Sequence, residues 1–136
     1  MSEPLWRLPA ATLAAAIAAK KVSPVELTEV VLARAERLQP ELNCFITLVP
    51  ERAREAAQRA EEAVMKGEPL GLLHGIPYAA KDLVNTAGVR TTFGSMLHAE
   101  NVPAEDAVAA ARLNRAGAIL FGKTTTPEFG HKALTD

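Results

Sequence analysis

The fold class is decided by residues 106–124, which read DAVAAARLNRAGAILFGKT. Residues 106–116 predict a helix, and Gly117 directly after them is typical of a left-handed helix cap. The apolar run Ala118–Phe121 then predicts a short buried strand, which Gly122 is expected to end. A helix that is closed by glycine and followed by a strand is a building unit of layered α/β domains.

The alternation of helices and strands continues toward the N-terminus. Helices are expected at 10–21, 24–39 and 50–66, a buried strand at 44–49, a compact apolar stretch at 74–82, and loops at 67–73 and 85–95. The second helix has a well-defined start, because Ser23 can cap it and Pro24 suits its first position. It is expected to end before Pro40. The order of elements predicts an α/β domain with at least partly parallel strand pairing.

Composition bounds the class of protein. A chain of 136 residues fits one domain, and 49% apolar residues with a net charge of -1 exclude intrinsic disorder. The chain contains 15 Lys and Arg residues and 16 Asp and Glu residues, so no basic surface and no nucleic-acid partner are expected. Cys44 is the single cysteine, so a disulfide framework is excluded and a reducing compartment is expected.

The apolar residues are mostly small. The chain has 26 alanines and six aromatic residues, and alanine buries little apolar area. A thin core is therefore predicted, and we expect it to pack against a further part of the protein. The uncharged stretch Leu8–Ala19 is shorter than the ~20 residues of a membrane span, and its lysines follow it rather than precede it, unlike a signal peptide. We therefore expect a cytoplasmic protein with no membrane partner.

Residues 117–124 match the phosphate-loop pattern G-x-x-x-x-G-K-[ST]. That loop needs a strand before its first glycine and an open backbone around the phosphates. Here a helix comes before Gly117, and the four intervening residues are typical of a buried strand. Nucleotide binding at 117–124 is thus the least favoured of the functional alternatives, and no cofactor is expected.

Few residues suggest nucleophilic or metal chemistry. Of the three serines, Ser2 is terminal, Ser23 is explained as a cap, and Ser95 lacks the G-x-S-x-G context of a nucleophile elbow. Cys44 lies in an apolar run, where a thiol is usually inert. The three histidines show no ligand spacing, so no metal site is expected.

Lys81 is the strongest chemical candidate. Ala79 and Ala80 precede it and Leu83 and Val84 follow Asp82, so partial desolvation is expected to lower its pKa. A neutral lysine can act as the general base for a serine. The alternative is an ordinary ion pair between Lys81 and Asp82 or another carboxylate, and the residues alone leave both open.

Several segments, in this order, resemble the amidase signature enzymes. They are Ser23–Thr28, Leu42–Ile46, Gly75-Ile76-Pro77 with Lys81-Asp82, Thr86-x-Gly88, Thr91-Thr92, Asp106-Ala107, Arg115–Ala118, Gly122-Lys123-Thr124 and Glu128-Phe129. The resemblance covers essentially the whole chain. It implies an α/β fold with a central mixed sheet flanked by helices, and hydrolysis or transfer at a carboxamide through an acyl-enzyme.

The resemblance also assigns roles. The catalytic unit of the family is a nucleophilic serine, a second serine on a cis peptide bond, and a lysine that matches Lys81. Both serines and the oxyanion hole lie in a Ser/Gly-rich stretch downstream of the residues that match 122–129, and this sequence does not contain that stretch. Residues 1–136 are therefore expected to be the N-terminal segment of a single amidase domain, incomplete and inactive alone.

The resemblance implies a small-molecule amide as substrate of the full-length enzyme. The expected partner is the remainder of the domain or a complementing chain, and self-association into a homo-oligomer is a further possibility. The alternative is a non-catalytic remnant, or half of a split amidase or amidotransferase.

Lys123 is interpreted as structural, because its place at a strand end suits bonding to backbone groups. Glu128 and His131 are interpreted as scaffold or rim.

Overall fold

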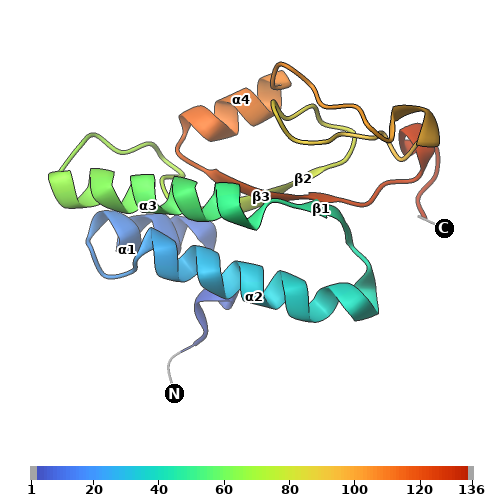
Figure 1. Cartoon of the computed structure of the whole chain (residues 1–136). Coiled ribbons are helices and arrows are strands. Elements are labelled where there is room, and N and C mark those ends of the chain that lie inside the picture. Colours follow the sequence, from blue (N-terminus) through green and yellow to red (C-terminus); the bar gives the residue numbers. More distant parts are fainter. Residues whose placement is uncertain (1–2, 135–136) are drawn as a thin grey trace.

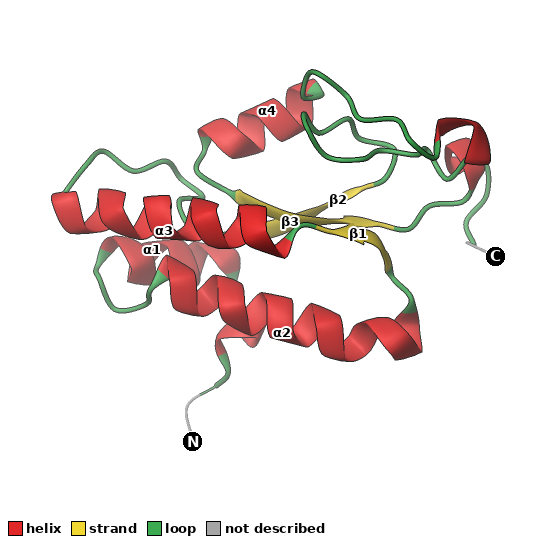
Figure 2. Cartoon of the chain, in the orientation of Figure 1, coloured by secondary structure: helices red, strands yellow, loops and turns green. Residues whose placement is uncertain are grey.

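The computed structural model describes residues 3–134 and is shown in Figure 1. Its elements are α1 (Ala10–Ala18), α2 (Pro24–Leu42), β1 (Phe45–Leu48), α3 (Pro50–Lys66), β2 (Pro77–Lys81), α4 (Val108–Arg115) and β3 (Ile119–Thr124). Single 3-10 turns lie at Leu5–Arg7, Met96–His98 and Glu128–Gly130. Helices α1, α2 and α3 lie on one side of the sheet, whereas α4 and the long loops around it lie on the other (Figure 2).

The three strands form a mixed sheet in the order β1-β3-β2. The central strand β3 pairs antiparallel with β1 and parallel with β2, which confirms the predicted α/β class and its partly parallel pairing. The strand expected to be buried at 44–49 is instead the edge strand β1, and its Ile46 is 37% exposed. An edge strand has a neighbour on one side only, so the apolar run in its sequence did not guarantee burial.

Helix α2 begins as predicted but ends later. The Ser23 hydroxyl accepts hydrogen bonds from the backbone N–H groups of Val25, at 3.1 Å, and Glu26, at 3.2 Å. The prediction that the helix ends before Pro40 was wrong, because α2 continues to Leu42. Pro40 lacks one N–H donor, but it is exposed and lies in the last turn, where water can satisfy the freed carbonyl.

Strand β3 is longer than its sequence indicated. Gly117 follows α4 at φ +89° and confirms the predicted left-handed cap. The prediction that Gly122 ends the strand was wrong, since β3 continues through Gly122, Lys123 and Thr124. A Cβ on Gly122 would come within 2.9 Å of a Leu48 methyl, so glycine permits the close approach of β1. Residues 119–124 are therefore strand, which rules out the phosphate-loop interpretation.

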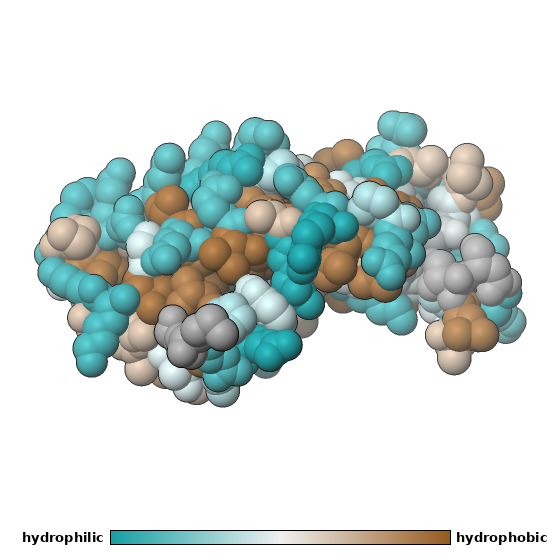
Figure 3. All heavy atoms as spheres, turned by 90° about the horizontal axis from the view of Figure 1, so that it is seen from below, coloured by the Kyte–Doolittle hydropathy of each residue, from teal (hydrophilic) through white to brown (hydrophobic). Residues whose placement is uncertain are grey.

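The buried apolar residues form three small clusters rather than one large core. One lies between α2, α3 and β3 and includes Leu32, Ala57 and Phe121. A second joins α1 to α2 around Ile17, and the third is built on Leu120 and Ala80 under the loops beside α4. Large apolar side chains remain exposed, among them Leu72, Met96 and Leu97. Figure 3 shows hydrophobic residues reaching the surface between hydrophilic ones on one face of the molecule.

None of the helices in the described part of the chain is both long and apolar enough to cross a membrane.

Candidate functional site

Lys81 is the last residue of β2, where the parallel strands β2 and β3 both end. Its side chain is exposed, whereas its neighbours Ala80 and Asp82 are 8% and 0% exposed. Successive side chains of a strand point to opposite faces, so the buried neighbours do not cover Lys81. The expected partial desolvation of Lys81 was therefore wrong for this chain: Ala80 and Asp82 are buried on the other face, and Ala79 packs toward the helices while Lys81 stays exposed.

Asp82 is paired with a different lysine from the one beside it in sequence. One Asp82 oxygen lies 3.8 Å from the Lys123 ammonium, and both side chains are fully buried. Asp82 also accepts hydrogen bonds from the N–H of Thr92, at 3.1 and 3.2 Å, and from the Thr92 hydroxyl. The alternative of a Lys81–Asp82 ion pair is thus not realised, because Lys123 and Thr92 occupy the carboxylate.

Lys123 lies on the central strand and points into the loop segment that follows β2. Its ammonium group donates to the Val84 carbonyl at 2.7 Å, to the Thr91 hydroxyl at 2.6 Å and to the Thr86 hydroxyl at 3.1 Å. Burial lowers the pKa of Lys123, and the nearby Asp82 carboxylate partly offsets that effect. These bonds to one carbonyl and two hydroxyls agree with the structural interpretation of Lys123.

The two lysines lie on opposite faces of the sheet. Lys123 is the register partner of Ala80, and paired residues of neighbouring strands share a face. Lys81, one residue further along β2, therefore projects from the other face. The exposed lysine and the buried lysine are close along the strands, but the sheet separates their environments.

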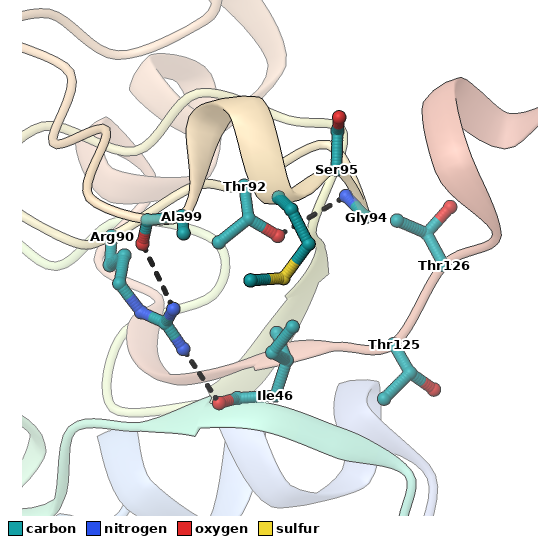
Figure 4. A pocket seen from close by; sticks show the side chains of 9 residues that line it. Ile46, Arg90, Thr92, Gly94, Ser95, Ala99, Thr125 and Thr126 are labelled. Atoms are coloured by element: carbon teal, nitrogen blue, oxygen red, sulfur yellow. Dashed lines mark hydrogen bonds between the residues drawn. The ribbon is translucent and has the colours of Figure 1, made fainter.

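A pocket of about 240 Å³ lies beyond the end of β3 (Figure 4). It is lined by Ile46, Arg90, Thr92, Gly94, Ser95, Met96, Ala99, Thr125 and Thr126. Arg90 forms one wall, where its guanidinium donates to the Ala99 carbonyl at 3.0 Å and to the Ile46 carbonyl at 3.3 Å. The pocket combines one cation with hydroxyl groups and apolar atoms, which suits a small polar organic molecule.

The serines that the structure describes are engaged by carboxylates. Ser95, which is 4% exposed, donates to Glu128 at 2.6 Å and so ties its loop to the chain after β3. The Ser23 hydroxyl donates to Glu61 in addition to capping α2. A hydroxyl hydrogen-bonded to a carboxylate in this way fits a structural role, and Ser2 lies outside the described residues. The Ser95–Glu128 bond was not foreseen, since nothing in the local sequence relates the two positions.

Metal-binding groups do not gather in residues 3–134, where no cluster of three or more His, Cys, Asp or Glu side chains could hold an ion. His74 contacts the Ala60 carbonyl at 2.9 Å, and His98 packs edge-on against Phe93 and Phe129. Cys44 is a free, half-buried thiol. Lys81 therefore remains the candidate for chemistry, as an exposed amine at the paired end of β2.

Comparison with known proteins gives the same family over most of the chain. A family model described as Amidase matches residues 26–136. A component of the glutamyl-tRNA(Gln) amidotransferase of Methylococcus capsulatus is 48% identical over 119 residues, which are 88% of this chain and 24% of that protein. An acylamidase of Rhodococcus erythropolis is 39% identical over 132 residues, which are 95% of this chain and 27% of that protein.

A solved structure agrees with these matches. The crystal structure of a bacterial aryl acylamidase of the amidase signature enzymes superposes with a TM-score of 0.88 at 28% identity, over 95% of this chain and 27% of that protein. The chain thus spans about a quarter of the length of the relatives it matches.

Proposed function

The chain belongs to the amidase family, and we propose that it forms the N-terminal segment of an amidase that hydrolyses a carboxamide at its C–N bond. In this proposal residues 1–136 belong to a single catalytic domain, and Lys81 is its catalytic lysine. The substrate is a small-molecule amide. Acylamidases among the relatives support the C–N bond of a carboxamide as the bond that is cleaved.

One observation carries the role of Lys81. Its backbone is held on both sides, by the pairing of β2 with β3 and by the bond from the Asp82 N–H to the Thr124 carbonyl at 3.0 Å, while its side chain stays exposed. A general base needs this combination of a fixed origin and free access to its partner. By contrast, Lys123 has a buried ammonium group that already has three hydrogen-bond acceptors.

The proposed reaction uses Lys81 in its neutral form, which requires that the remainder of the domain cover this exposed side chain. Lys81 accepts a proton through a bridging serine, and the nucleophilic serine then attacks the carbonyl carbon. The C–N bond breaks, the proton returns through the bridging serine to the leaving ammonia or amine, and water cleaves the acyl ester. We propose that both serines and the oxyanion donors come from the remainder of the domain or from a complementing chain.

A second candidate is part of a split amidotransferase. The 48% identity to a component of a glutamyl-tRNA(Gln) amidotransferase favours it. The same acyl-enzyme chemistry would serve and water would still cleave the acyl ester, but the released ammonia would pass to an acceptor instead of diffusing into solvent. The role of Lys81 is the same in both candidates.

The test is complementation. The chain replaces the matching segment of the Rhodococcus erythropolis acylamidase, and turnover is measured on an amide that the unaltered acylamidase cleaves. We expect the joined enzyme to be active and the 136-residue chain alone to be inactive. Lys81→Met should lower kcat about 1,000-fold or more, because the general base is lost.

Lys66→Met is the matched control, since Lys66 is also an exposed lysine but lies at the end of α3. Its kcat should stay unchanged, and circular dichroism should show that both variants fold. Turnover by the chain alone, or undiminished turnover by Lys81→Met, would contradict the proposal. A folded but inactive joined enzyme would favour the non-catalytic remnant.

A further inference from the structure

We propose that Lys123 is a positioning residue for Lys81: its buried side chain fixes the loop segment 82–92 and thereby the place where β2 ends. The inference rests on the proposed function, because it concerns the precision with which Lys81 is held. It goes further by assigning a role in the reaction to a group on the opposite face of the sheet.

All the hydrogen-bond acceptors of Lys123 lie in one short segment. The Val84 carbonyl and the hydroxyls of Thr86 and Thr91 follow Lys81 within the same loop and surround the ammonium group at 2.6–3.1 Å. An ammonium group has three N–H donors, and these three acceptors match them. Lys123 itself is held in the central strand, so the loop is tied to the middle of the sheet.

Asp82 links this arrangement directly to Lys81. Its carboxylate lies 3.8 Å from Lys123 and accepts hydrogen bonds from the N–H and the hydroxyl of Thr92, and its N–H donates to Thr124. The residue after Lys81 is therefore fixed through its backbone and its side chain. Because Phe93 N–H also donates to the Asp82 carbonyl, at 3.0 Å, the far end of the loop returns to the same residue.

A role beyond stability follows from the cost of this arrangement. Burying a charge is expensive, and an apolar side chain of similar volume often stabilises a protein as well or better. An apolar side chain could replace Lys123 beneath the loop 82–92. The Val84 carbonyl and the hydroxyls of Thr86 and Thr91 would then lose the ammonium group that sets their positions. A displacement of about 1 Å in a catalytic group can cost about 100-fold in rate. Lys123 thus supplies placement rather than chemistry.

Two variants test the proposal at different strengths. Lys123→Met removes all three hydrogen bonds, and Thr91→Val removes one acceptor at nearly constant volume. Thr91→Ser keeps the hydroxyl and is the conservative variant. In the joined enzyme we expect kcat to fall about 100-fold for Lys123→Met and about 10-fold for Thr91→Val, with KM changed less than about twofold, and Thr91→Ser to stay near the parent.

Hydrogen exchange of the 136-residue chain gives a second readout that does not depend on catalysis. The N–H groups of Thr92 and Phe93 both donate to Asp82 and should exchange faster in Lys123→Met and Thr91→Val. Ile17→Ala is the control, because Ile17 is fully buried in the separate cluster around α1. It should lower stability while leaving the kcat of the folded enzyme within about twofold.

The outcomes separate the two proposals. Faster exchange with an unchanged kcat overturns the positioning role and leaves the proposed function intact. An unchanged exchange rate overturns the role of the Lys123 bonds in fixing the loop. Undiminished turnover by Lys81→Met overturns the proposed function, whatever Lys123 does. If Lys123→Met fails to fold, Thr91→Val against Thr91→Ser carries the same comparison.

Discussion

The two sides of the sheet are stabilised in different ways. On one side, α2 and α3 pack against β3 through small apolar side chains, and Ala53 and Ala57 are completely buried. On the other side, the loop 82–92 is held by buried polar groups, of which Asp82, Thr86 and Thr91 are also completely buried. The helical side depends on close packing, whereas the loop side depends on hydrogen bonds to Lys123 and Asp82.

The ion pairs show the same contrast. Arg54 and Glu29 join α3 to α2 at 2.7 Å, but their side chains are 41% and 47% exposed, so the pair is screened by water and contributes little. Lys123 and Asp82 are fully buried at 3.8 Å, where an unpaired charge would be costly. The candidate catalytic lysine, Lys81, directly precedes Asp82 of the second pair in the sequence, although its side chain projects from the opposite face of the sheet. The backbone that carries Lys81 is therefore anchored by a pair whose members cannot be removed singly.

Removal of Asp82 is expected to have the largest effect on stability. Asp82→Ala leaves the buried Lys123 ammonium without its carboxylate and the Thr92 N–H without an acceptor. Breaking a buried pair in this way destabilises proteins by about 3–5 kcal/mol. Urea unfolding of the chain measures the loss. Glu105→Ala, which removes an exposed carboxylate in the same long connection between β2 and α4, should change the unfolding free energy by less than about 0.5 kcal/mol.

If Asp82→Ala and Glu105→Ala lowered the unfolding free energy by similar amounts, the buried pair would contribute no more to stability than an exposed carboxylate. In that case the contrast between the two sides of the sheet would fail on the loop side, and Lys123 would need another explanation.

Enlarging a buried alanine tests the helical side. Ala57→Leu adds volume where α3 packs on β3 and should cost about 1–3 kcal/mol through overpacking. Gln58→Leu places the same side chain on the exposed face of the same helix and should change stability by less than about 0.5 kcal/mol. Equal effects in the two variants, measured by urea unfolding, would mean that close packing at Ala57 is not required.

The helical side could largely be predicted from the sequence because its signals are local. Ser23 and Pro24 set the start of α2, and Gly67 and Gly117 end α3 and α4, each within one turn of the element concerned. The end of α2 was nevertheless misplaced, because a proline in an exposed last turn is tolerated. A second error arose where a distant part of the chain makes the deciding contact. Strand β3 extends through Gly122 because β1 approaches it closely there, and residue spacing alone does not record that contact.

The end of β2 and the loop that follows it could be predicted only in part. Lys81 was identified from its neighbours and from the family resemblance, and its catalytic role stays a prediction. The alternative of a Lys81–Asp82 pair is not realised, because the two side chains point to opposite faces, and the partner of Asp82 is Lys123 on another strand. The burial of Lys81 was misjudged for the same reason. Patterns along one segment do not show which segments meet across a sheet.

The smallest predicted effect is the dependence of the unfolding free energy on alkaline pH, which comes from the buried Lys123 on the loop side. Burial lowers the pKa of Lys123 below its ordinary value of 10.5. As pH rises through the folded-state pKa, the folded protein releases this proton before the unfolded chain does, so the unfolded chain binds more protons. The free energy of unfolding should therefore rise with pH in the window below 10.5, by at most about 1.4 kcal/mol per pH unit for one proton.

The difference between the parent chain and Lys123→Met isolates this effect. Tyr78 acts in the opposite direction, because burial raises its pKa and the folded state keeps that proton longer, but both proteins contain Tyr78. Urea unfolding between about pH 8 and pH 10 should thus show the parent gaining stability relative to the variant. A constant or shrinking difference would mean that Lys123 carries no desolvation cost. The Lys123–Asp82 pair would then behave like the exposed Arg54–Glu29 pair, which forms without burying a charge.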